Sequence, residues 1–326
     1  MAGSLDQNPP NAERHITAGG TDWLWTVFAI MTVSTLGMMI WSFERTRGSR
    51  FFHNISIVIL TTASIAYFTM ASDLGATPIT PEFRNTGTRQ IFYVRYIQWF
   101  INFPLLLVLI LYATGIALSD VLTTAFFAWV VVVTGLVGAL THSSYKWGYF
   151  TLGVVSLFYI WYVFILLLHG PRSSFASGSG VRSDFIRGAS FVVLITMLYP
   201  VCWGVSEGGN VISPNREMVF YGILDLLLGP VFLFYFVWGL SNVDYGLFKF
   251  NSCRPTDAPY GYGVESATGG KSRRAGDEDG GIVPNLPGTH NTAAPSAGAD
   301  ATGVSTGVAS SGAVPTTTKA EHTSVA

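Results

Sequence analysis

Charged residues are scarce in this sequence. They make up 11% of its 326 residues, whereas soluble domains carry about 25%. Sequence motifs for phosphate binding, dinucleotide binding, zinc binding or a nucleophilic serine are absent, which argues against an enzyme. A net charge of -1 argues against nucleic acid as a partner. Because 49% of the residues are hydrophobic, we expect the lipid bilayer to surround the protein.

Cysteine is also rare, since Cys202 and Cys253 are the two in the chain. A predicted membrane span separates them, so we expect no disulfide. The first 20 residues lack a basic start followed by an apolar core, which is the pattern of a cleavable signal peptide. We therefore expect the first apolar segment to direct membrane insertion.

Seven apolar stretches are long enough to cross a bilayer, which takes about 20 residues of helix. Because helices satisfy their own backbone hydrogen bonds in lipid, the pattern predicts an all-α membrane protein with a seven-helix bundle. The predicted spans are residues 22–43, 52–73, 89–113, 119–140, 146–168, 184–206 and 217–241.

Basic residues in the short loops predict the orientation. The loop after the first span carries Arg45, Arg47 and Arg50, and the loop after the fifth carries Arg172 and Arg182. Loops of this kind stay in the cytoplasm, so the N-terminus should be outside and the C-terminus inside. We expect three regions: a polar extracellular N-terminus (1–21), the seven-helix domain (22–245) and a disordered Gly/Ala/Ser/Thr-rich cytoplasmic tail (246–326).

Strong charges are rare inside the predicted spans, where Arg95 lies in the third and Asp225 in the seventh. A charge inside a membrane is costly and needs a partner. Both helices start on the outer side, and the predicted starts place Arg95 about 9 Å and Asp225 about 12 Å deep. We therefore expect Arg95 to be the partner of Asp225.

Polar and aromatic residues accompany these charges at helical spacing. Gln98 and Asn102 continue the Arg95 stripe beside Trp99, while Tyr199 and Trp203 share a face of the sixth span. We expect these residues to line an interior cavity. Packing and hydrogen bonding between helices remains the alternative explanation.

Three motifs resemble the microbial rhodopsins. "RYIQWFINFPLLL" resembles their third-helix signature, "YPVCWGVSEGG" their sixth helix and "LDLLLG" the seventh-helix Leu-Asp. The resemblance covers residues 22–245 in order and spacing. It implies that Arg95, Trp99, Tyr199, Trp203 and Asp225 belong to a former chromophore pocket and counter-ion cluster.

The departures from the microbial rhodopsin pattern concern the photochemistry. The seventh-helix lysine that binds retinal through a Schiff base corresponds to Gly229 here, and glycine has no amine. The third-helix proton acceptor corresponds to Gln98, and the cytoplasmic proton donor of pumping members to Leu109, neither of which titrates. Covalent retinal is therefore not expected, whereas non-covalent retinal stays open.

This pattern resembles the opsin-related proteins of fungi, which include a heat-shock-induced plasma membrane group. The resemblance implies a non-photochemical, stress-linked protein of the plasma membrane, of a group in which some members are thought to moderate a proton ATPase. Family members often form trimers, which makes a homo-oligomer an expectation here.

Two other functions stay open. A light-independent ion channel or transporter could use the Arg95, Gln98, Asn102 and Asp225 interior, with Glu207 and Glu217 as an outer acidic group. A binding protein could hold retinal or another apolar ligand without a covalent bond, because Gly229 leaves room where a lysine would run. An enzyme is not expected, since no nucleophile–base or metal-binding constellation is visible.

Overall fold

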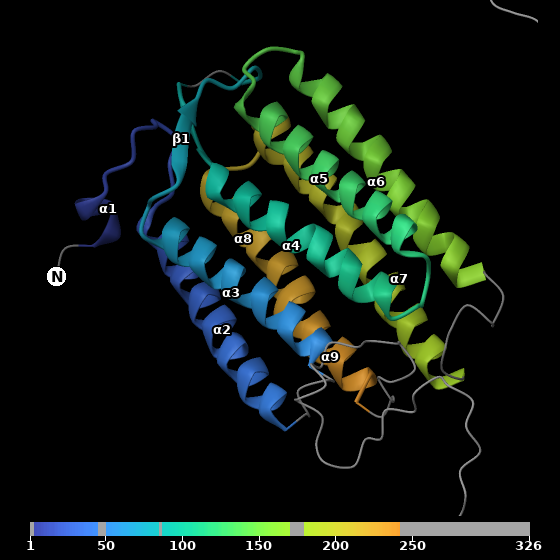
Figure 1. Ribbon diagram of the computed structural model, residues 1–326. Helices are drawn as coiled ribbons and strands as arrows, with labels where there is room; N and C mark the ends of the chain where they lie inside the picture. Colours follow the sequence, from blue (N-terminus) through green and yellow to red (C-terminus); the bar gives the residue numbers. More distant parts are fainter. Residues whose placement is uncertain (1–2, 45–49, 85–86, 170–178, 242–326) are drawn as a thin grey trace, which may run out of the picture. The chain divides into compact units, whose positions relative to one another are not determined.

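The computed structural model describes residues 3–44, 50–84, 87–169 and 179–241 (Figure 1). The chain divides into two units, Met1–Val264 and Glu265–Ala326. The second unit lies outside the described residues, and so does the whole of the predicted tail, residues 246–326. The fold described here is that of the first unit.

Helices dominate the described residues, and seven helical spans are long and apolar enough to cross a membrane. They confirm the predicted fold class and make the chain an integral membrane protein. The spans consist of α2 (Ala18–Phe43), α3 (Phe51–Ala71), α4 (Tyr93–Tyr112), α5 (Leu118–Leu140), α6 (Lys146–His169), α7 (Ser179–Trp203) with its π-helical extension η3 (Gly204–Gly208), and α8 (Pro214–Leu226) with η4 (Leu227–Val231) and α9 (Phe232–Gly239). A short helix, α1 (Ser4–Gln7), precedes them.

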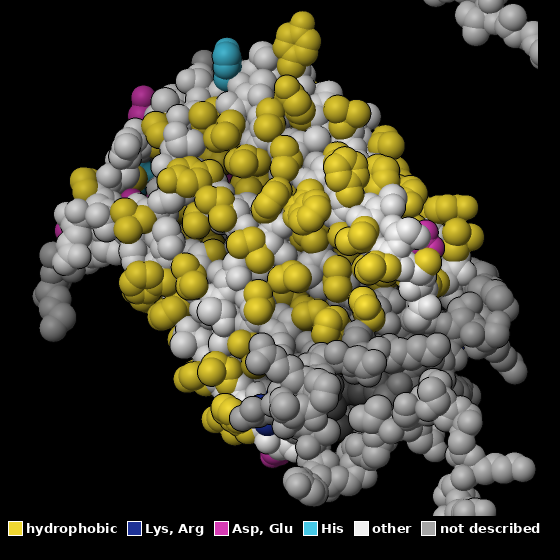
Figure 2. Space-filling model, viewed as in Figure 1, with side chains coloured by type: hydrophobic (Ala, Val, Ile, Leu, Met, Phe, Trp, Pro, Cys, Tyr) yellow, Lys and Arg dark blue, Asp and Glu magenta, His cyan; other side chains and the backbone are white. Residues whose placement is uncertain are grey.

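Each span packs against its neighbour in the chain, and α8 also packs against α2, which closes the bundle (Figure 1). Short connections between antiparallel helices explain this order. Apolar side chains cover the face of the bundle that Figure 2 shows. Large apolar residues of the bundle, such as Ile40, Phe43 and Leu122, are more than half exposed, as expected of a surface that faces lipid.

A two-stranded sheet joins α3 to α4. Strands β1 (Ala76–Ile79) and β2 (Arg89–Phe92) pair antiparallel, with Thr77 opposite Ile91. Figure 1 places this hairpin at the end of the bundle where α4 begins, which we call the hairpin end. The prediction that the third span starts at residue 89 was wrong, because residues 89–92 are strand and the helix begins at Tyr93.

Helix α8 begins earlier than predicted, at Pro214 rather than at residue 217. Ser213 is its N-cap, with the side-chain oxygen 3.5 Å from the amide of Arg216, and proline suits the first turn of a helix because its missing N–H has no partner there. The span then passes through the π-helical turn η4, which contains Gly229 and Pro230. These two shifts in helix starts change the depth of the charged residues.

Candidate functional site

Asp225 lies on α8 and is 2% exposed. Four neutral groups donate hydrogen bonds to its carboxylate. Oδ2 accepts from Tyr67 Oη at 2.7 Å and Gln98 Nε2 at 3.3 Å. Oδ1 accepts from Tyr199 Oη at 2.5 Å and Trp99 Nε1 at 3.1 Å. The donors come from α3, α4 and α7, so the buried carboxylate ties four helices together.

Arg95 is not the partner of Asp225, and this prediction was wrong. The guanidinium instead forms ion pairs with Glu207 and with Glu217, the latter at 3.1 Å. The helix starts explain the error. Arg95 is two residues after Tyr93 and about 3 Å deep, whereas Asp225 is eleven residues after Pro214 and about 16 Å deep.

The ion pairs of Arg95 belong to a larger cluster that also contains Arg89. Arg89 Nη2 lies 2.5 Å from Glu217 Oε2, and all four charged side chains are buried. Two arginines and two glutamates give the cluster no net charge, which makes its burial tolerable. We call Arg89, Arg95, Glu207 and Glu217 the ion cluster.

Two tyrosines complete the ion cluster. Tyr96 Oη donates to Glu207 Oε1 at 2.9 Å, and Tyr221 Oη to Glu207 Oε2 at 3.3 Å. The Arg95 guanidinium carbon also lies 3.7 Å from the centre of the Tyr221 ring, a cation–π contact. Of the four charged residues in the ion cluster, the sequence pointed to Arg95, Glu207 and Glu217 but not to Arg89.

Gly229 lies one helical turn beyond Asp225, in η4. A Cβ built on Gly229 would lie 3.4 Å from Met31 Cε and 3.7 Å from Leu60 Cδ2. These are ordinary van der Waals distances, so a first side-chain carbon at Gly229 would fit in contact with Met31 of α2 and Leu60 of α3. The chain has four lysines. The one within the described residues, Lys146, donates from Nζ to the carbonyls of Glu207 and Gly208 at 3.3 and 3.4 Å.

Gln98 and Asn102 lie on the same face of α4 and are both buried. Asn102 Nδ2 donates to the carbonyl of Ile59 at 3.1 Å, while Gln98 donates to Asp225. Both residues thus link helices through hydrogen bonds, and neither lines the cavity described next.

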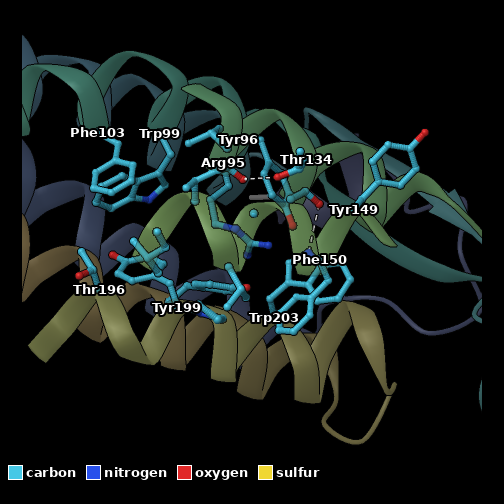
Figure 3. A pocket seen from close by; sticks show the side chains of 18 residues that line it. Arg95, Tyr96, Trp99, Phe103, Thr134, Tyr149, Phe150, Thr196, Tyr199 and Trp203 are labelled. Carbon is cyan, nitrogen blue, oxygen red and sulfur yellow. Dashed lines mark hydrogen bonds between the residues drawn. The ribbon is translucent and has the colours of Figure 1, made fainter. Parts of the chain in front are cut away.

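An apolar cavity of about 120 Å³ lies among α4, α5, α6 and α7 (Figure 3). Trp99 and Phe103 face Thr196 and Tyr199 across it, and Phe150 and Trp203 lie together toward its other end. The rings of Trp99 and Tyr199 are 5.0 Å apart at their centres. Because both residues also donate to Asp225, they form the wall between this cavity and the carboxylate.

Residues 19–238 match the sequence model of the bacteriorhodopsin-like protein family. The chain belongs to the bacteriorhodopsin-like family. A curated relative, Protein FDD123 of Trametes versicolor, is 56% identical and covers 78% of this chain and 89% of its own. The opsin-like protein carO of Fusarium fujikuroi is 45% identical, with 74% and 81% covered. The 30 kDa heat shock protein of Saccharomyces cerevisiae is 34% identical, and the alignment covers 73% of this chain and 78% of that protein.

Solved structures of other members share the fold. The light-driven proton pump of Coccomyxa subellipsoidea matches with a TM-score of 0.65 at 31% identity, covering 70% of this chain and 99% of its own. The light-driven proton pump of Leptosphaeria maculans has the same TM-score at 26% identity, with 72% and 98% covered. The similarity to the bacteriorhodopsin-like family thus extends from the three sequence motifs to the whole bundle.

Retinal, the cofactor of light-driven members, does not fit as a covalent group at the position that the resemblance indicates. Gly229 supplies no amine, and Met31 and Leu60 occupy the adjacent space. Asp225, which would balance a Schiff-base cation, instead accepts hydrogen bonds from four neutral donors. The residues present can hold a buried carboxylate without a chromophore.

Proposed function

We propose that this chain is a light-independent opsin-related protein with a stress-linked, regulatory role at the plasma membrane. The observation that carries the proposal is Gly229, one turn beyond Asp225 and packed against Met31. Without an amine at this position, retinal cannot attach covalently. No Schiff-base proton is then present for light to move.

The stress-linked role draws on the relatives. One of them is named as a 30 kDa heat shock protein, and the chain covers most of its length. The partner we propose is a proton ATPase of the plasma membrane, and we propose that the chain itself forms a homo-oligomer. Both assignments rest on the resemblance to fungal opsin-related proteins.

The geometry favours a regulatory role, exerted through a partner protein, over a role in ion transport. Arg89 and Arg95 neutralise Glu207 and Glu217, so the outer acidic group is not free to accept a cation. The inner half of α4 is apolar, and Leu109 is fully buried where pumping members hold a proton donor. A proton path that started at Asp225 would have no carboxylate to pass through along this half of α4.

The first test is the absorption spectrum of the purified protein after addition of all-trans retinal, followed by borohydride trapping. We expect no shifted band and no trapped adduct. The variant Lys146→Arg identifies any adduct formed at the lysine of the described region. The double variant Gly229→Lys/Met31→Ala is the positive control, since it supplies both the amine and the space. A trapped adduct on the wild-type chain would falsify the light-independent assignment.

The second test concerns the partner. ATP-driven proton uptake is measured in plasma-membrane vesicles from heat-stressed cells with and without this protein, at equal ATPase content. We expect uptake to differ between the two, and vesicles from unstressed cells are the control. Equal uptake in stressed vesicles would rule out the ATPase as the partner. Light scattering of the purified protein measures whether it is a homo-oligomer.

The apolar cavity favours a second candidate function, the non-covalent binding of an apolar ligand such as retinal. The cavity is lined by aromatic and aliphatic side chains, which are typical of small-molecule sites. A shifted but untrappable retinal band, weakened in a Gly135→Phe variant that fills the cavity, would support this candidate. An unshifted spectrum would exclude retinal as its ligand.

A further inference from the structure

A second, polar hollow of about 40 Å³ lies at the hairpin end, away from the sites described above. The N-terminal segment forms one wall and the start of the hairpin the other. Its lining includes Pro9, Pro10, Asp73, Thr77, Pro78 and Gln90. The hollow has room for about three water-sized groups, since one such group needs roughly 10–15 Å³.

Asp73 is the charged residue of this hollow, and it is 8% exposed. Gln90 Nε2 donates to its Oδ1 at 2.7 Å. No donor among the described residues lies within hydrogen-bonding distance of Oδ2, which is buried. An unpaired buried carboxylate oxygen costs free energy, so this atom requires a ligand.

Burial raises the pKa of Asp73 above that of an exposed aspartate, which shows that the hollow disfavours an uncompensated negative charge. The Gln90 hydrogen bond and the charge of nearby His15 act in the opposite direction without cancelling this effect. Asp73 also holds a left-handed backbone conformation, with φ at 57°. Aspartate and asparagine tolerate that conformation better than most residues.

The residues that line the hollow carry oxygen acceptors as well as donors. Three of its lining residues are prolines, which have a carbonyl oxygen but no N–H. Oxygen ligands of this kind suit hard cations. A monovalent cation would balance the single carboxylate, whereas a divalent one would leave a buried net charge, which is costly.

We propose that the hollow at Asp73 is a binding site for a monovalent alkali cation, sodium or potassium, held by Asp73 Oδ2 and neighbouring oxygen atoms. The site would join the N-terminal segment to the hairpin between α3 and α4. It is independent of the chromophore position and of the proposed regulatory role.

The test uses the full chain purified in detergent, unfolded by heat in chloride salts of sodium, potassium or N-methylglucamine at one ionic strength. N-methylglucamine is too large for the hollow. We expect a midpoint about 2–4 °C higher in sodium or potassium than in N-methylglucamine. Asp73→Asn keeps the shape and the backbone preference but removes the charge, and this difference should vanish. Asp22→Asn, an exposed aspartate at the start of α2, should retain it.

Sodium NMR gives a readout that does not depend on folding of the variant. We expect the wild-type protein to broaden the sodium line and potassium to reverse the broadening. Equal midpoints in all three salts, with no broadening, would mean that water alone satisfies Asp73, and would overturn the proposal. Stabilisation by calcium but not by sodium or potassium would overturn the monovalent assignment.

Discussion

Tyr67 on α3 donates a hydrogen bond of 2.7 Å to Asp225 on α8, and both side chains are buried. The bond connects two helices that are distant in the sequence. It helps to hold a carboxylate that forms no ion pair with any of the described residues. Hydrogen bonds to a charged group contribute about 1.5–3 kcal/mol.

Removal of the Tyr67 hydroxyl tests this contribution. We expect Tyr67→Phe to lower the free energy of unfolding by about 1.5–3 kcal/mol, measured by denaturant unfolding in detergent. Tyr145, which is 80% exposed, provides the control variant Tyr145→Phe, which should change stability little. Equal stability of the two variants would show that Asp225 does not depend on Tyr67.

The ion cluster predicts a strong coupling between Arg89 and Glu217. Arg89→Gln leaves Glu217 with Arg95 alone and should lower stability by about 3–5 kcal/mol, the usual cost of breaking a buried pair. Glu217→Gln should have a cost of the same order. The double variant should be more stable than the sum of the two losses implies, because it leaves no unpaired charge from this pair. Additive losses would contradict the pairing.

Two glycines of the α8–η4 region give a matched comparison. At Gly222 an added Cβ would lie 2.5 Å from Trp23 Nε1, which donates to the carbonyl of Met218. At Gly229 the nearest atom is the flexible end of Met31, at 3.4 Å. Gly222→Ala should therefore lower the thermal midpoint, whereas Gly229→Ala should change it little. A larger loss for Gly229→Ala would show that η4 needs glycine for its backbone.

Asp73 predicts a pH dependence of stability at the hairpin end. Its pKa is raised in the folded protein, so folding favours the protonated carboxyl. The stability that this preference contributes is full below the ordinary aspartate pKa of about 3.9 and is lost as the pH rises through the higher folded pKa. In sodium- and potassium-free buffer, wild type should therefore lose stability relative to Asp73→Asn over this window. A difference that is constant with pH would contradict the shift.

The sequence was sufficient for the bundle because the spans are marked by composition. Long apolar runs separated by polar breaks allow few structures in lipid. The motifs around Arg95, Tyr199 and Asp225 then indicated the family. The start of α4 was missed because Ile91 and Phe92 run directly into the apolar helix, and the predicted span was carried back over Arg89 and Gln90. A four-residue strand has no periodicity long enough to separate it from a helix.

The pairing of charges could not be predicted for the same reason. The predicted helix starts were wrong by three or four residues, which changes a depth by about 5–6 Å. This error was enough to place Arg95 and Asp225 at similar predicted depths. Tyr67 gave no signal either, since a tyrosine in an apolar run is usually a packing residue. The structure places α3 beside the seventh span and reveals the Tyr67 hydroxyl as a donor to Asp225.

The N-terminal segment closes over the bundle through contacts that are distant in the chain. Arg14 donates from its backbone amide to Thr88 and from its guanidinium to Asn210, 196 residues away. Ribosomes add about 5–20 residues per second, so about 10–40 s separate the synthesis of Arg14 from that of Asn210. The N-terminal segment therefore cannot form its hydrogen bond to Asn210 until most of the bundle has been synthesised. Its contacts with the bundle are among the last to form.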